Sequence, residues 1–267
     1  MRRSLDEQAA MAVVPRTAAT VLILRDTNDG PEVLMVRRSP NASFMPGAYV
    51  FPGGAVDDGD ARPATDESDE QIERRIGDVL GVNGRARAFA VAALRECFEE
   101  CGLWLGVDEP FDSIALRAKL HGGLSIGEIA RLGDLPLATS GLHPWSRWVT
   151  PLGIPKRFDT AFFVCRAPDG QTPTVDEGET TTLAWVRPEA ALASHSQGDF
   201  QMEFATISTV RSLVPFARQS VRAIFEHARG QQALPTIHPR LRLNAERHIV
   251  GVAMPGETGY ETLFGDG

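Results

Sequence analysis

The sequence is short of cysteine and has no long hydrophobic run, and each shortage excludes a class of protein. Three cysteines stand in 267 residues, at Cys97, Cys101 and Cys165. They are too few for a disulfide framework and suit a reducing compartment. No apolar stretch approaches the roughly 18 residues of a membrane span. The N-terminal residues 1–15 start with basic side chains, but acidic residues interrupt them, so a secretory signal is not expected. The sequence predicts a cytoplasmic protein.

Basic charge is also in short supply. The 27 lysines and arginines face 35 aspartates and glutamates, which gives a formal net charge of -8. A protein that coats duplex nucleic acid normally presents a basic field, so nucleic acid is not an expected partner. An anionic small molecule is not excluded, because a bound metal ion can invert the local charge. The chain is long enough to bury a sizeable core, as one enlarged domain or two small ones. We expect an enzyme.

Hydrophobic periodicity predicts strands and helices in mixed order. Buried or paired strands are expected at 17–25, 31–37, 49–51, 158–165 and 181–186. Helices are expected at 68–80, 86–101, 113–121 and 126–132, with a helical stretch over 204–229 that Pro215 interrupts. The tail over 240–263 alternates weakly and predicts a hairpin, whereas 60–67 is expected to be a solvated acidic loop. This order predicts an α/β or α+β sandwich.

The strongest chemical feature lies on the helix expected over 86–101. With Glu96 as origin, Glu99 lies at about -60° and Glu100 at about +40° around a helix of 3.6 residues per turn. Like charges at these spacings destabilise a helix by a few tenths of a kcal/mol per pair. A divalent cation would turn that repulsion into coordination, because Mg²⁺ prefers carboxylates with waters and phosphate oxygens. The alternative is a solvated acidic face.

A glycine loop lies upstream of this helix, in the sequence Phe51-Pro52-Gly53-Gly54, and glycine lets the backbone approach a ligand closely. The loop and the helix together resemble the Nudix box, G-x5-E-x7-R-E-U-x-E-E-x-G-U, where U is bulky and apolar. Gly54 takes the first position. The helix positions are taken by Arg95, Glu96, Glu99, Glu100, Gly102 and Leu103.

The box is split in this chain. The acidic residue six after Gly54 is Asp60 rather than glutamate, and Arg95 follows it by 35 positions where the motif has eight. The inserted segment, about 61–87, contains the expected helix 68–80, and it leaves the role of Asp60 open. An insertion of this kind resembles the coenzyme A diphosphatases of the peroxisomal type and their bacterial relatives.

Further markers of that branch cover about 16–215. They are Arg38-Ser39, Ser43 and Gly47 before the box, then Trp148-Val149-Thr150-Pro151 and Arg157-Phe158-Asp159-Thr160. Other coenzyme A-cleaving Nudix enzymes carry L-L-T-x-R-[SA]-x3-R-x3-G-x3-F-P-G-G ahead of the box. The spacing is kept here, but Val36 replaces the threonine and Ser43 replaces the second arginine.

The resemblance implies hydrolysis without a covalent nucleophile, assisted by Mg²⁺ or Mn²⁺. It implies that Glu96, Glu99 and Glu100 ligate the metal, with the carbonyl of Gly53. It further implies that Arg95 holds one of these carboxylates through a bidentate contact. Such a site takes a small-molecule nucleoside diphosphate as substrate.

The general base and the residues that bind phosphate are less defined. The base is either a glutamate of the box or one of Glu177 and Glu179, of which Glu179 is favoured; an exposed acidic turn is the alternative. Gly54, Arg38 and Arg157 are candidates for substrate binding, the arginines because a guanidinium donates two hydrogen bonds to phosphate. A surface salt bridge is equally compatible with each arginine.

Other reactive or aromatic residues are assigned mainly to structure. Cys97 and Cys101 fall on the apolar side of their helix, so core packing is favoured over metal binding. A loop position is favoured for His143, although it stands where it could touch substrate. The aromatic side chains that could stack on adenine, with the core as the favoured alternative, are Trp145, Trp148 and Phe158.

These expectations describe a Nudix α/β/α sandwich around a mixed sheet. The domain is expected over 16–230, with helical insertions at about 61–87 and 111–135, between a 1–15 and a 231–267 extension. The expected activity is cleavage of coenzyme A or acyl-coenzyme A into 3′,5′-ADP and 4′-(acyl)phosphopantetheine. The alternatives are the same chemistry on ADP-ribose or NADH, and a Nudix-like sensor that only binds a nucleotide. The sequence leaves the oligomeric state open.

Overall fold

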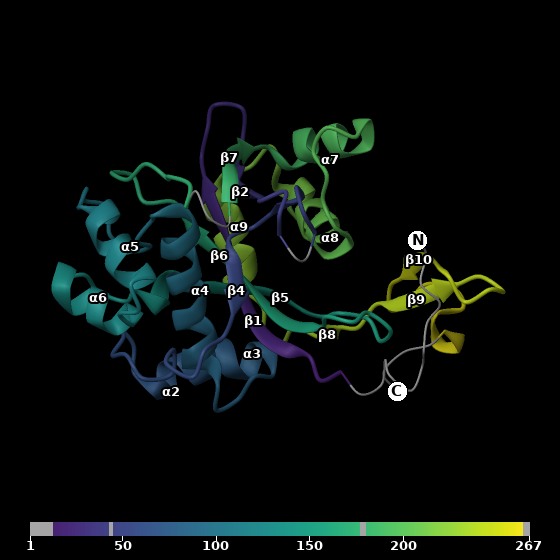
Figure 1. Ribbon diagram of the computed structural model, residues 1–267, viewed down its shortest axis with the longest axis horizontal. Coiled ribbons are helices and arrows are strands. Elements are labelled where there is room, and N and C mark those ends of the chain that lie inside the picture. Colours follow the sequence, from purple (N-terminus) through teal and green to yellow (C-terminus); the bar gives the residue numbers. More distant parts are fainter. Residues whose placement is uncertain (1–12, 43–44, 177–179, 264–267) are drawn as a thin grey trace.

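A computed structural model of the chain describes residues 13–42, 45–176 and 180–263. It consists of a mixed sheet between two layers of helices, with a small hairpin at one end (Figure 1). The sandwich expected from the sequence is therefore confirmed.

The central strand of the sheet is β1, which pairs on both of its edges. The strands of this sheet are β1 (Arg16–Arg25), β2 (Glu32–Arg38), β3 (Tyr49–Val50), β4 (Gly53–Ala55), β5 (His143–Val149), β6 (Phe158–Arg166), β7 (Thr180–Val186) and β8 (Thr236–Ile237). Their order is β3-β2-β1-β6-β5-β8, with β4 also paired to β1 and β7 to β2. The β1–β6 and β5–β8 pairs are parallel, and the remaining pairs are antiparallel.

Two apolar cores lie on opposite faces of this sheet, because successive side chains of a strand point to opposite sides. On β1, Ala19, Val21 and Ile23 pack into the core that also holds the apolar side of α4. Leu22 and Leu24 pack into the core beneath the C-terminal helices. All five side chains are fully or almost fully buried.

The first face of the sheet carries α4 (Ala86–Cys101) and the helices around it (Figure 1). They are α2 (Asp69–Ile72), the π-helical turn η1 (Glu73–Gly77), α3 (Asp78–Leu80), α5 (Ser113–His121), α6 (Ile126–Gly133) and the 3-10 turn η2 (Thr139–Gly141). The other face carries α7 (Pro188–Gln197), α8 (Phe204–Leu213), η3 (Val214–Phe216) and α9 (Val221–Arg229).

The ends of α4 show how the insertion supports the box helix. Its first residues have no side-chain cap of their own, and the Glu73 carboxylate accepts hydrogen bonds from the backbone N–H groups of Gly84 and Ala86. These N–H groups have no partner within a helix, so the insertion supplies one. At the other end, Gly102 adopts a left-handed conformation with φ 67°, as expected for the residue after a helix.

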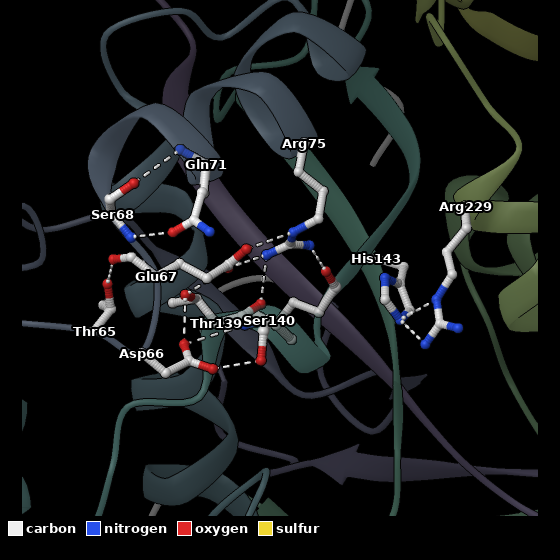
Figure 2. Close-up of polar contacts among 11 residues, drawn as sticks. Thr65, Asp66, Glu67, Ser68, Gln71, Arg75, Thr139, Ser140, His143 and Arg229 are labelled. Atoms are coloured by element: carbon white, nitrogen blue, oxygen red, sulfur yellow. Dashed lines mark hydrogen bonds and ion pairs between the residues drawn. The ribbon is translucent and has the colours of Figure 1, made fainter.

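The inserted segment forms the expected helical structure, with one local difference. The capping box of Ser68 and Gln71 and the left-handed stop at Gly81 are both present. The middle of the expected helix is a π-helical turn, Glu73–Gly77. Arg75 lies in this turn and bonds Glu67 and the main-chain carbonyl of Thr139 (Figure 2). The insertion is therefore joined to the segment that enters β5.

The C-terminal residues divide between the sheet and a separate hairpin. The strand β8 pairs with β5, so the expected 231–267 extension begins by adding a strand to the main sheet. Beyond it, β9 (Arg240–Leu243) and β10 (Ile249–Ala253) form the expected hairpin, followed by η4 (Tyr260–Thr262). In the part of the chain that the structure describes, no helix has the length and hydrophobicity of a membrane span.

Two of the longer elements, β5 and α7, have no counterpart among the elements predicted from the sequence. β5 carries Trp145 and Trp148, which pack against Phe216 and Phe204 of the C-terminal layer. α7 begins with Pro188, a favoured residue in a first helical turn. Its low amphipathicity explains why periodicity does not indicate it.

Candidate active site

The three glutamates of α4 line one pocket of about 610 Å³, which residues of β1, β4 and β6 also line. Glu96, Glu99 and Glu100 form its acidic wall together with Gly53 and Gly54 of β4. Glu100 is buried, and the other two are half-buried. The helical spacing predicted from the sequence therefore places all three carboxylates on the same cavity.

The two glycines of β4 allow this close packing. A Cβ atom on Gly54 would lie 2.5 Å from the carboxylate of Glu96, which no side chain can accommodate without displacing it. The backbone N–H of Gly53 donates to Oε2 of Glu100 over 3.1 Å. Gly54 pairs with Ala19 of β1, so the sheet itself fixes the distance between β4 and α4.

Arg95 is the centre of the polar contacts beneath this wall. Its Nε and Nη2 donate to the two oxygens of Asp60, each over 3.0 Å. Its Nη1 donates to Glu96 over 2.8 Å and to Glu99 over 3.0 Å. The bidentate contact expected for a box glutamate is therefore made with Asp60, and Glu96 and Glu99 share the remaining nitrogen.

Asp60 is consequently part of the site framework. Only 2% of it is exposed, and it also accepts a hydrogen bond from the backbone N–H of Asp57 over 2.8 Å. The expectation that 60–67 is a solvated loop is wrong at this position. Because the contact with Arg95 spans 35 residues, only the fold that closes the insertion reveals it.

The buried charges alter one another's pKa. Burial acts to lower the pKa of Arg95, but the hydrogen bond to Asp60 and the charges of Glu96 and Glu99 raise it above its ordinary value. Burial raises the pKa of Glu99, and Arg95 only partly opposes this. One guanidinium thus serves several carboxylates, and the site carries an excess of negative charge.

The donor set of the acidic wall fits a divalent cation. Among the described residues, no three Asp, Glu, His or Cys side chains are gathered around one point that could hold a metal ion. Instead, Glu96 and Glu99 turn oxygens toward Arg95, and Glu100 turns one toward the N–H of Gly53. Carboxylate oxygens beside an open cavity are nevertheless the hard ligands that Mg²⁺ prefers, and a cation would neutralise the excess charge.

The two arginines proposed for phosphate have different surroundings. Arg38 is half-buried and lines the pocket. Arg157 is 5% exposed and donates to the main-chain carbonyls of Thr150 and Val13 over 3.0 and 3.1 Å. It does not line the pocket, so its position favours a structural role. Ser43, Glu177 and Glu179 lie outside the described residues.

Other groups at the pocket were not selected from the sequence. His121 at the end of α5 approaches Asp176, with 3.3 Å between its Nε2 and the aspartate Oδ1. Both line the cavity, as do Arg16 and Lys156. None of the four belongs to the box motif, and only the folding of distant segments onto α4 brings them together.

The remaining candidates are structural. Cys97 and Cys101 are free thiols in the core, where burial raises their pKa well above its ordinary value. His143 lies in β5 rather than in the expected loop, buried beside Arg229. Of the three aromatics considered for adenine, Phe158 lines the pocket, whereas Trp145 and Trp148 pack against the C-terminal layer.

A larger depression of about 960 Å³ lies elsewhere, between the insertion and α6. Arg62, Asp66 and Arg131 are among its lining residues, and none of the box glutamates reaches it. The chemistry of the box therefore belongs to the smaller pocket.

This sandwich, with three glutamates on the helix that follows a glycine strand, defines a hydrolase of the Nudix type, which acts on diphosphates. The family model for the NUDT19 Nudix domain matches residues 71–211, and the chain belongs to this family. Nudix hydrolases act on small-molecule diphosphates and generally use divalent metal ions.

Known proteins of the same type resemble this chain. Human acyl-coenzyme A diphosphatase NUDT19 is 27% identical over 87% of this chain and 73% of its own length. The Xenopus laevis acyl-coenzyme A diphosphatase NUDT19 is 28% identical, over 61% of this chain and 54% of its own length. The crystal structure of a Nudix hydrolase from Alicyclobacillus acidocaldarius is similar, with a TM-score of 0.63 and 29% identity over 80% of this chain and 97% of that one.

Proposed function

We propose that this protein hydrolyses the diphosphate of coenzyme A or acyl-coenzyme A, giving 3′,5′-ADP and 4′-(acyl)phosphopantetheine. The observation that carries the proposal is a single pocket with Glu96, Glu99 and Glu100 on one wall and cationic side chains beyond it. The names of the human and Xenopus relatives support the substrate. A cytoplasmic location stays a prediction from the sequence.

We assign Glu96, Glu99 and Glu100, with the carbonyl of Gly53, as the groups that would hold Mg²⁺ or Mn²⁺. A bound divalent ion supplies charge neutralisation of the diphosphate and a lowered pKa for a water. The three residues line the cavity, and Glu100 is buried enough to be held in one orientation.

Arg95 acts as a positioning residue in this proposal. Its Nε and Nη2 atoms are bonded to Asp60, so Nη1 is the atom that holds Glu96 and Glu99 in place. The two carboxylates are thereby kept beside each other despite their repulsion. Glycine at position 54 leaves the room that the Glu96 carboxylate occupies.

For the general base, we propose Glu179. The residues on both sides of its segment support this choice: Asp176 lines the pocket, and Thr180 pairs with Arg38, which also lines it. Glu177 and the box glutamates are the alternatives. Glu179→Gln should then lower turnover far more than Glu177→Gln, and equal, small effects of both would assign the base to the box.

The cationic side of the pocket supports substrate binding by Arg38 and by the backbone at Gly54. Arg38 extends from the end of β2, and its guanidinium suits a phosphate oxygen. We do not carry Arg157 into the substrate site, because its guanidinium is bonded to main-chain carbonyls.

The test is a substrate panel with Mg²⁺, containing coenzyme A, acyl-coenzyme A, ADP-ribose, NADH and diadenosine polyphosphates, with products identified by mass. Formation of 3′,5′-ADP and the (acyl)phosphopantetheine is the expected result. A preference for ADP-ribose or NADH would overturn the coenzyme A assignment. Tight nucleotide binding without turnover would instead indicate a sensor.

A further inference from the structure

The pocket extends in two directions from the acidic wall, and strand register defines both. Gly54, beside Glu96, pairs with Ala19. Arg16 lies three residues back along β1, about 10 Å away at 3.3 Å per residue. In the other direction β3 precedes β4 along the chain, and Arg38 of β2 donates its backbone N–H to the carbonyl of Ala48, the residue before β3, over 2.9 Å. The carboxylates therefore lie between two separate ends.

The floor toward Arg16 is one face of the parallel pair β1–β6. The register aligns Arg16 with Phe158, Ala18 with Thr160, and Thr20 with Phe162. All six line the pocket, as expected for alternate residues of neighbouring strands. The side chains at positions 18, 20 and 160 are small and leave room in the pocket above the strands. Phe158 adds a half-buried ring at the end of this floor.

Two cations and this ring meet at the far end of the floor. Arg16 and Lys156 are both exposed and line the cavity, and Nζ of Lys156 lies 5.7 Å from the centroid of Phe158. In the other direction lies Arg38, and two apolar residues, Met45 and Leu120, also line the cavity. An aromatic ring with cations suits a phosphorylated nucleoside.

We propose that Arg16 and Lys156 bind a phosphate on the ribose of the substrate, separate from the diphosphate that is cleaved. The enzyme then selects nucleoside diphosphate derivatives that carry a 2′- or 3′-phosphate. This inference rests on the proposed diphosphatase activity and extends it to specificity. The distance of these cations from Glu96 separates them from the group that the acidic wall would hold.

The experiment measures kcat/KM of the intact protein with Mg²⁺ on two matched pairs: coenzyme A against 3′-dephospho-coenzyme A, and NADPH against NADH. The variant is Arg16→Gln with Lys156→Gln. The control is Arg166→Gln with Lys119→Gln, which removes the same charge from exposed positions outside the pocket. Circular dichroism checks that both variants fold.

For the wild type we expect a preference of about 10- to 100-fold for the phosphorylated member of a pair, the usual effect of hydrogen bonds to a charged group. The Arg16/Lys156 variant should lose that preference, mainly through KM, and should cleave the unphosphorylated member almost as well as before. The control should keep the preference. Equal losses on both members, or no loss, would overturn the inference.

The two pairs also separate this inference from the proposed function. A preference within the coenzyme A pair assigns the subsite to a 3′-phosphate. A preference within the NADPH pair, with no cleavage of coenzyme A or its dephospho form, assigns it to a 2′-phosphate and overturns the coenzyme A assignment. Cleavage of coenzyme A and its dephospho form at equal rates, with no preference within the NADPH pair, overturns the subsite and leaves the proposed function standing. Binding of 3′,5′-ADP compared with 5′-AMP, measured by calorimetry, gives the same comparison without turnover.

Discussion

At the scale of single residues, three glutamates on one helix provide the chemistry that the fold presents to the pocket. Each carboxylate has its own contact. Glu96 occupies the space that a Cβ atom on Gly54 would fill, Glu99 accepts a hydrogen bond from Arg95, and Glu100 accepts one from the backbone N–H of Gly53. The role of each should therefore be separable from the stability of the fold.

Glu99→Gln and Glu100→Gln should each lower turnover by roughly a hundredfold or more, because charge stabilisation by a metal is worth several kcal/mol. The amides keep the shape of the side chains, so far-ultraviolet circular dichroism should be unchanged. Glu109→Gln, at an exposed position outside the pocket, is the control. Near-full activity in both box variants would show that this wall is not the metal site.

Gly54→Ala tests the approach of β4 to α4. The added Cβ would meet the Glu96 carboxylate at 2.5 Å, so the carboxylate must move, and we expect kcat to fall by at least about tenfold, as positional errors of this size do. Gly59→Ala is the control, because nothing lies within 4 Å of its Cβ position. Equal kcat values in the two variants would contradict the argument.

At the scale of elements, the insertion both splits the box and supports it. Glu73 caps α4, and Asp60, at the start of the insertion, holds Arg95. Arg75 joins the inserted helices to the turn before β5 through Glu67 and the carbonyls of Thr139 and Leu142 (Figure 2). The inserted residues are therefore part of the framework of the site.

Two adjacent arginines of the insertion allow a matched test of this anchoring. Arg75→Gln should lower the free energy of unfolding by about 2–3 kcal/mol, because it leaves Glu67 and two carbonyls without a charged donor. Arg74→Gln should change it by less than about 0.5 kcal/mol, since Arg74 pairs with Glu70 in an exposed contact. Urea denaturation of both variants measures the difference, and similar small losses would contradict the anchoring role.

At the scale of the whole molecule, the two helical layers meet the sheet through buried polar groups as well as apolar ones. His143 of β5 is one of these, and it contacts Arg229 of α9. Burial lowers its pKa to about 4, assisted by the charges of Arg229 and Arg75. The native protein therefore keeps this imidazole neutral under conditions in which an unfolded chain would protonate it.

The stability of the protein should fall on acidification for this reason. Below the ordinary histidine pKa of about 6.5, the unfolded state gains a proton that the native state excludes, so the free energy of unfolding decreases between about pH 6.5 and pH 4. His143→Gln should make the free energy of unfolding less dependent on pH in this range, by an amount that corresponds to at most one proton taken up on unfolding. Urea denaturation at a series of pH values tests it, with His248→Gln, a half-buried histidine of the turn before β10, as the control.

Features that depend on local sequence could be predicted before any fold was known. The helix over 86–101 is an example, because its apolar side, its left-handed stop at Gly102 and the spacing of its glutamates all lie within 17 residues. The capping boxes at Ser68 and Ser125 are equally local, and both are present. β5 could not be predicted in this way, since its strand pairing, rather than its own pattern, defines it.

The sequence predicted only some of the residues of the site. The motif selected the carboxylates, made Arg38 and Arg157 equal candidates for phosphate, and left the role of Asp60 open. The structure lines the pocket with Arg38 but not with Arg157, and joins Asp60 to Arg95. Both outcomes depend on contacts between distant segments: Asp60 reaches Arg95 across the insertion, and Arg157 is buried against Val13 and Thr150.

The sequence by itself determined the class of chemistry, because three carboxylates at helical spacing after a glycine strand require no long-range information. The tertiary structure alone decided which side chains share the pocket with them. Arg16 and Lys156 are separated by more than half the chain, and the parallel register of β1 and β6 brings their segments to one end of the cavity. Side-chain identity sets what a group can do, but strand pairing sets what it stands beside.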